Sequence, residues 1–172
     1  MSFLARILGR GGPSREPLRP LWHAVVATSR EREWYADCAV ADTVQGRFDM
    51  IALVLGLVML RMEKSEELAP QTALITELFV ADMDRQLRDT GVGDLMVGKN
   101  MGKLMSALGG RMGSLRDAMT ESDAALATIL HRNVALVDEE KKPYALAVRT
   151  RALANDLAAL DDAALLAGQL RP

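Results

Sequence analysis

Few residues of this chain have the types and spacing that chemistry requires. The segment Gly93–Lys99 has the G-x-x-x-x-G-K spacing of a phosphate-binding loop. The next residue is Asn100, where Mg²⁺ binding needs a serine or threonine hydroxyl. The preceding element also has a helical pattern, whereas a phosphate loop follows a strand. The glycine spacing has a simpler use, which is to end one helix and start the next.

Carboxylates, histidines and nucleophiles do not cluster either. Asp82 and Asp84 are two residues apart, and on a helix such side chains point about 200° apart, so they cannot share a metal ion or a proton. We expect them to pair with arginines instead. The two histidines, His23 and His131, stand apart, and no set of His, Cys, Asp and Glu has metal-ligand spacing. No nucleophile has a recognisable base. The sequence therefore predicts a protein that is not an enzyme and carries no cofactor or metal.

The single cysteine, Cys38, excludes an intrachain disulfide and suits a reducing compartment. Methionine has a less even distribution. Five of the ten methionines lie between residues 96 and 119: Met96, Met101, Met105, Met112 and Met119. Flexible, polarizable side chains of this kind can line a groove that grips varied apolar helices. They can equally be ordinary core filling in a chain with only 4% aromatic residues. Both interpretations stay open.

The elements that position these residues are predicted to be helices. Apolar residues make up 49% of the 172 residues, and alanine, leucine and methionine, which favour helices, are abundant. No strand alternation is convincing. We therefore expect an all-α, single-domain bundle of six or seven helices. The predicted organisation is an N-terminal segment and linker over 1–20, a helical domain over 21–160, and a short C-terminal helix and tail over 161–172.

Apolar spacing places the helices. A helix that is apolar nearly all round, Phe48 to Met62, belongs at the centre of the domain, where Gly56 allows close helix contact. From Met101 to Met119 the apolar positions alternate by four and three, which indicates a heptad-like seam. A glycine hinge joins this helix to the one before it, as a hairpin at about 74–119. The other predicted helices span 21–32, 74–89, 121–137, 144–160 and 161–170, and 34–47 is predicted to be a loop with a helical turn.

Two features bear on membranes. The longest apolar run, 50–60, is shorter than the roughly 20 residues that cross a bilayer. Residues 1–10 are predicted to form a short amphipathic helix with Arg6 and Arg10 on one side. It is either a weak anchor at an anionic membrane or a terminus that frays or docks on the core. The formal net charge of −2 does not indicate a nucleic-acid-binding surface.

Residues 74–101, LITELFVADMDRQLRDTGVGDLMVGKNM, resemble the signature of the ubiquinol–cytochrome c chaperone family. The resemblance extends over roughly 21–155. Its central positions are the segments 77–79, 82–85, 87–88, 91–95 and 97–99, and Tyr35, Asp42-Thr43 and Gly46-Arg47-Phe48-Asp49 also match. Ala41 stands where the family pattern has proline.

The resemblance implies a non-enzymatic assembly factor for the cytochrome bc1 complex, whose client is newly made cytochrome b. It implies a bacterial member at the cytoplasmic face of the inner membrane, and its mitochondrial relatives work with a small partner protein and near the ribosome. The corresponding expectation is a client-binding site on the hairpin, with charged residues as a rim and methionines as a floor. The candidate residues are Phe79, Asp82, Met83, Arg85, Arg88, Gly91, Gly93, Asp94, Lys99, Met101, Met105 and Met112.

Other classes remain open from the sequence alone. One is a structural helical module that self-associates through the 101–119 seam. Another is a peripheral membrane adaptor. The third is an enzyme that uses the acidic helix or the Gly93–Lys99 segment.

Overall fold

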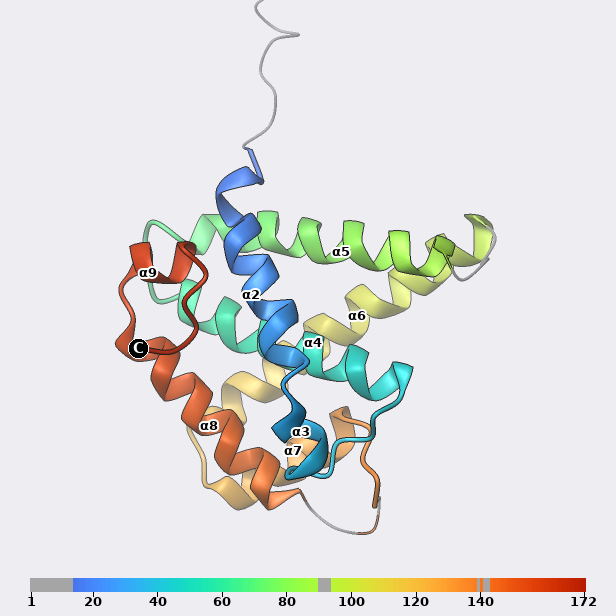
Figure 1. Cartoon of the computed structure of the whole chain (residues 1–172), viewed down its shortest axis with the longest axis vertical. Helices are drawn as coiled ribbons and strands as arrows, with labels where there is room; N and C mark the ends of the chain where they lie inside the picture. Colours follow the sequence, from blue (N-terminus) through green and yellow to red (C-terminus); the bar gives the residue numbers. More distant parts are fainter. Residues whose placement is uncertain (1–13, 90–93, 139, 141–142) are drawn as a thin grey trace, which may run out of the picture.

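The computed structural model describes residues 14–89, 94–138, 140 and 143–172, and for Leu87, residues 94–105 and Ala107 it describes the backbone alone. The described chain is all-α, as predicted, with six α-helices of eleven residues or more. The elements are η1 (Glu16–Leu18), α2 (Arg19–Ser29), α3 (Arg32–Ala36), α4 (Val44–Met62), η2 (Ala69–Gln71), α5 (Thr72–Asp89), α6 (Asp94–Met119), α7 (Asp123–Asn133), α8 (Tyr144–Ala159) and α9 (Asp162–Leu166) (Figure 1).

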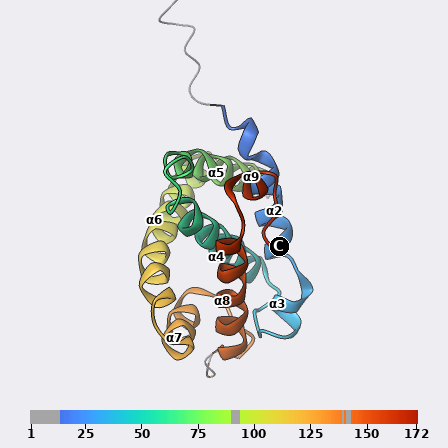
Figure 2. The same ribbon diagram turned by 90° about the vertical axis from the view of Figure 1, so that its left-hand side faces the viewer.

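Helix α4 lies at the centre, as its uniformly apolar sequence predicts. It packs against α2, α6 and α8, and its residues from Asp49 to Val58 are all buried (Figure 2). Thr43 caps its N-terminus, because the hydroxyl accepts a hydrogen bond from the Gly46 amide at 3.1 Å. At Gly56 an added Cβ would lie 3.2 Å from both the Leu115 Cδ2 and the Met112 Sδ. The prediction that Gly56 permits close helix contact is confirmed.

The N-terminal helix α2 joins α4 to α5 through aromatic side chains. Leu21, Val25 and Thr28 recur at helical spacing, and all three are buried. Trp22 meets the edge of Phe79 on α5 with ring centroids 6.1 Å apart. Phe48 on α4 lies 6.0 Å from the same ring. Because offset and edge-to-face rings are favourable arrangements, this cluster fixes α5 above the core.

The C-terminal residues fold back onto α2. Gly168 has a φ of +88°, and an added Cβ there would lie 2.9 Å from the Pro20 carbonyl oxygen. Leu18, Leu165 and Leu170 are all buried in the core. Hydrophobic packing therefore continues across the predicted domain boundaries at 20 and 161.

One predicted helix ends early. The 121–137 helix stops at Asn133, so the prediction for residues 134–137 was wrong. Val134 is extended, and Leu136 forms an antiparallel bridge with Val40. The Ala41 amide donates to the Ala135 carbonyl at 2.9 Å, and the Val137 amide donates to the Ala39 carbonyl at 2.9 Å. These bonds to a distant segment replace the helical ones, and sequence periodicity cannot show them.

The 34–47 segment contains a helical turn, as predicted, but the helices on both sides of the loop have other bounds than predicted. Helix α3 begins at Arg32, and α4 begins at Val44, before the predicted start at Phe48. Trp34 is fully buried, and its indole N–H donates to the Thr28 carbonyl at 2.7 Å. That anchor ends α2 at Ser29 and turns the chain into α3.

Acid should weaken the attachment of α9. Arg61 donates to the Leu160 carbonyl at 2.7 Å and to Asp162 at 2.8 Å, and Ser65 also donates to Asp162. The hydrogen bond from Ser65 and the Arg61 guanidinium lower the pKa of the Asp162 carboxyl below its usual 3.8. A lowered folded-state pKa stabilises the protein above the unfolded pKa, and that stability is lost as pH falls through the folded pKa.

We therefore expect Asp162→Asn to destabilise the protein at neutral pH, with the difference from the wild type shrinking below about pH 4. Urea unfolding at several pH values measures it. The control is Asp117→Asn, which removes one exposed carboxylate elsewhere in the fold. A wild-type advantage over Asp162→Asn that is constant from neutral pH to below pH 3 would contradict the prediction.

Candidate client-binding site

The predicted hairpin is formed by α5 and α6, which pack against each other (Figure 1). Helix α5 crosses α2 and contacts it, and α6 packs against α4 and α7 (Figure 1). Residues 90–93, with the predicted hinge at Gly91 and Gly93, lie outside the described residues. Helix α6 begins at Asp94, so the backbone from there through Lys99 is helical and is not a phosphate-binding loop.

The described candidate residues divide into two groups. Phe79, Met83 and Met112 are 0%, 5% and 7% exposed, because they face the core between the helices. They do not form an open floor in this conformation. Asp82, Arg85 and Arg88 lie on the outer side of α5. The side chains of Asp94, Lys99, Met101 and Met105 lie outside the described part of the chain.

Four charged side chains of α5, together called the polar ridge here, are Asp82, Asp84, Arg85 and Arg88; they span a wide arc of the helix surface, because Asp82 and Asp84 point in different directions. Arg85 Nη2 lies 2.5 Å from Asp82 Oδ1, and Arg88 Nε lies 2.8 Å from Asp84 Oδ2. Gln86 also donates to Asp82, at 3.3 Å. The two carboxylates thus hold different arginines, as their spacing predicts. Exposed pairs of this kind contribute only about 0.3–0.5 kcal/mol each, so their main effect is to orient the guanidinium groups.

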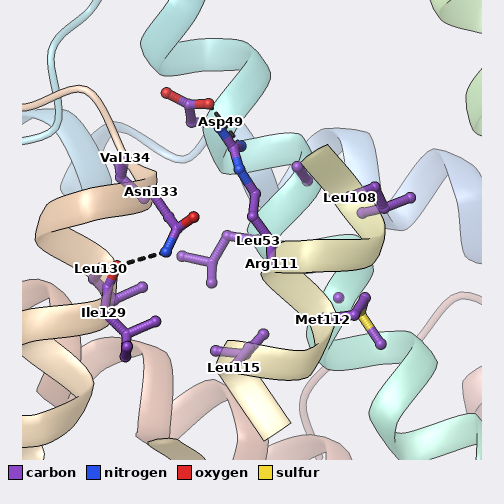
Figure 3. Close-up of a pocket in the computed structure, with 12 residues that line it drawn as sticks. Asp49, Leu53, Leu108, Arg111, Met112, Leu115, Ile129, Leu130, Asn133 and Val134 are labelled. Atoms are coloured by element: carbon purple, nitrogen blue, oxygen red, sulfur yellow. Dashed lines mark hydrogen bonds and ion pairs between the residues drawn. The ribbon is translucent and has the colours of Figure 1, made fainter. Parts of the chain in front are cut away.

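Beneath α6 lies a small cavity of about 20 Å³. Helices α4, α6 and α7 line it, largely with apolar side chains that include Leu53, Leu115 and Leu130 (Figure 3). A water molecule needs roughly 10–15 Å³ of such volume. The cavity can hold one water molecule but is too small for a side chain of another protein.

A buried ion pair borders this cavity, and sequence reasoning did not select it. Arg111 Nη1 on α6 lies 2.7 Å from Asp49 Oδ1 on α4, and Asp49 is 3% exposed (Figure 3). Although close, this contact lacks hydrogen-bond geometry at Nη1. The Asp49 carboxylate also accepts from Gln45 Nε2 at 2.9 Å and from the Ala135 amide at 3.1 Å. One carboxylate therefore joins α4, α6 and the 134–137 segment. The available signal was an aspartate at the start of an otherwise apolar helix.

The side chains outside the hairpin supply no catalytic arrangement that we can identify in the described residues. No group of three or more His, Cys, Asp or Glu side chains there could hold a metal ion. Cys38 is buried, and burial raises the pKa of its thiol, which disfavours the reactive thiolate. None of the helices that the structure describes combines the length and apolarity needed to cross a bilayer.

Similarity to known proteins shows the class and the family of this chain. It is similar to the structure described as "Crystal structure of the Cbp3 homolog from Brucella abortus", with 31% sequence identity and a TM-score of 0.77, covering 97% of this chain and 94% of that one. Fold and similarity together define an all-α chaperone domain. The model of the ubiquinol-cytochrome C chaperone family matches residues 36–172. The chain belongs to the ubiquinol-cytochrome C chaperone family. Among curated proteins, no significant match was found.

Proposed function

We propose that this protein binds newly made cytochrome b and assists its assembly into the ubiquinol–cytochrome c reductase (bc1) complex, without catalysing a reaction. The observation that carries the proposal is the family match over residues 36–172, which includes the whole α5–α6 hairpin. A newly made membrane protein presents apolar helices together with charged loop residues, and a chaperone must recognise both.

The polar ridge on α5 supports a role in orienting the client. Its arginines are held by carboxylates one helical turn away, so they are presented in a defined arrangement. Arg85 is 71% exposed and Arg88 is 49% exposed. Charge complementarity at such a rim contributes mainly to orientation and association rate. The apolar part of the site would then come from the rest of the hairpin, where Met101 and Met105 remain candidates.

The proposal places the protein at the cytoplasmic face of the inner membrane of a bacterium, where a membrane client is inserted. Residues 1–10, outside the described residues, are the proposed contact with anionic lipid. A small helical partner protein is a further proposed component.

Reversing the charges of the ridge should reduce client capture. We expect Arg85→Glu combined with Arg88→Glu to lower the amount of cytochrome b recovered with the tagged protein about tenfold, because rim charges govern encounter and orientation. The measurement is co-purification from mildly solubilised cells, quantified against other membrane proteins. Circular dichroism checks that the variant is folded.

The matched control is Lys64→Glu combined with Arg132→Glu, two exposed cations on other faces of the fold. It makes the same change in net charge and should leave capture near the wild-type level. Equal capture by a folded ridge variant would remove Arg85 and Arg88 from the site. Absence of cytochrome b from the wild-type preparation would overturn the proposed client itself.

Self-association through the 101–119 seam is less well supported. Leu108, Met112 and Leu115, its described central positions, are buried within the chain against α4 and α7. Because these side chains are already in the core, a second copy could reach them only if α6 left its place.

A further inference from the structure

An open hollow lies on the opposite end of α2 from η1, between α3 and the first turn of α4. Its volume is about 530 Å³, and its lining is formed by Arg30, Arg32, Tyr35, Ala36, Asp42 and Arg47. The hairpin contributes nothing to it, so the proposed client-binding ridge does not explain it. Tyr35, Asp42 and Arg47 were also matched to the family pattern, although the proposed function assigns no role to them.

The hollow carries uncompensated positive charge. Three guanidinium groups face one carboxylate in the lining. Asp42 neutralises Arg47, whose Nε lies 2.6 Å from Asp42 Oδ1. Arg30 and Arg32 make no ion pair within the described residues. Glu31, which lies between them, is directed elsewhere, because it pairs with Arg149 at 3.0 Å and with Arg171 at 2.5 Å.

One side chain in the wall of the hollow is held by a hydrogen bond. The Tyr35 hydroxyl donates to the Ser29 carbonyl at 2.8 Å, which fixes the ring between α2 and α3. Burial raises the pKa of Tyr35, and the charges of Arg47, Asp42 and Arg30 also act on its hydroxyl. These groups therefore lie around one ring, although they come from three separate elements.

Guanidinium groups are suited to one class of ligand in particular. Their planar N–H donors match the oxygens of a phosphate group, often two at a time. We propose that the hollow formed by Arg30, Arg32, Tyr35 and Arg47 binds a phosphate group. Arg30 and Arg32 supply the free charges, and the Nη atoms of Arg47 remain available because Asp42 uses its Nε. The size of the hollow leaves room for the molecule that carries the phosphate.

The test uses the full chain and two probes. The first probe is inorganic phosphate, titrated against the protein by NMR at fixed ionic strength, with chloride as the competing anion. The second is co-sedimentation with phosphatidylcholine vesicles, with or without phosphatidylglycerol. We expect Arg30→Gln combined with Arg32→Gln to weaken binding about tenfold, since it removes two charge-assisted contacts. Asp42→Asn should strengthen binding several-fold, because it removes the carboxylate that competes for Arg47.

Matched controls separate the hollow from overall charge. Lys64→Gln with Arg132→Gln repeats the loss of two cations, and Glu66→Gln repeats the loss of one carboxylate, on other faces of the fold. Both controls should bind as the wild type does. Saturable phosphate binding without vesicle binding supports the site and assigns it to a soluble phosphate compound. Vesicle binding that depends on phosphatidylglycerol and is lost in the arginine variant supports it and assigns it to a lipid headgroup.

Two results would overturn the proposal. One is the absence of binding to both probes. The other is binding that the arginine variant and its control lose equally, which would show diffuse attraction to a charged surface. Either result leaves the client-capture experiment on the α5 ridge unaffected, because the two sites share no residue.

Discussion

Replacing Asp49 with alanine is expected to lower the free energy of unfolding by about 3–5 kcal/mol, the usual cost of breaking a buried ion pair. Arg111 would then remain largely buried without its counter-charge, and the Ala135 amide would lose its acceptor. For a chain of this size the melting temperature should fall by roughly 6–20 °C, at about 2–4 °C per kcal/mol. Urea unfolding and thermal melts measure the two quantities.

A double variant separates the effect of the Asp49–Arg111 ion pair from the effect of the packing around it. Asp49→Leu combined with Arg111→Met removes both charges and keeps apolar volume. The double variant should therefore lose much less free energy of unfolding than the sum of the losses in the two single variants. The exposed Asp42–Arg47 pair is the control, and Asp42→Ala should cost much less than Asp49→Ala because solvent screens an exposed pair. If Asp49→Ala costs no more than Asp42→Ala, Asp49 does not join the three segments energetically.

Gly46→Ala is expected to be as damaging, although it adds only one methyl group. An alanine Cβ at this position would lie 1.9 Å from the Ala41 carbonyl oxygen, which is a backbone atom and cannot swing aside. The first turn of α4 or the 41–43 segment must therefore move, and the Thr43 cap would be disturbed with it. We expect a loss of about 3 kcal/mol or more, at the upper end for overpacking.

The matched control is the same substitution in open space. At Gly110 on α6 an added Cβ would meet nothing within 4 Å. Alanine there should stabilise the protein by about 0.5–1 kcal/mol, because glycine is the poorer helix former. The two glycine-to-alanine variants should thus have effects of opposite sign. A Gly46→Ala protein as stable as the wild type would show that the 41–46 turn relaxes freely.

The long helices could be predicted because the pattern of apolar residues within each helix indicates which of its faces is buried. In α4 nearly every residue from Met50 to Val58 is apolar, and the helix is buried all round. In α2, Leu21, Val25 and Thr28 recur at helical spacing, and this spacing marks the inward face. The aromatic contact of Trp22 on α2 could not be predicted in the same way. Its partner, Phe79, is distant in sequence and was assigned to the client site instead.

The features that could not be predicted depend on distant partners. Val134 and Val137 fit a helical period, but residues 134–137 bond to residues 39–41, so the helix stops before them. Methionine is a residue type that suits an apolar binding groove, but Met83 and Met112 are both buried in the core. Helical periodicity predicts that such residues face an apolar surface. It does not distinguish a surface of the same chain from a surface of another protein. Asp49 stands out in the sequence as a charged residue in an otherwise apolar helix. Nothing in the sequence marks Arg111 as its partner.

The contact between the first helical region and the last residues has a consequence for synthesis. Glu31, which follows α2, is paired with Arg149 on α8 and with Arg171, 140 positions later in the chain. The backbone of Gly168 lies close to the Pro20 carbonyl group at the start of α2. A chain that emerges from the ribosome in order cannot complete the surroundings of α2 until residues near 170 have been released. Helix α2 is therefore made early among the described helices, but it reaches its final packing late.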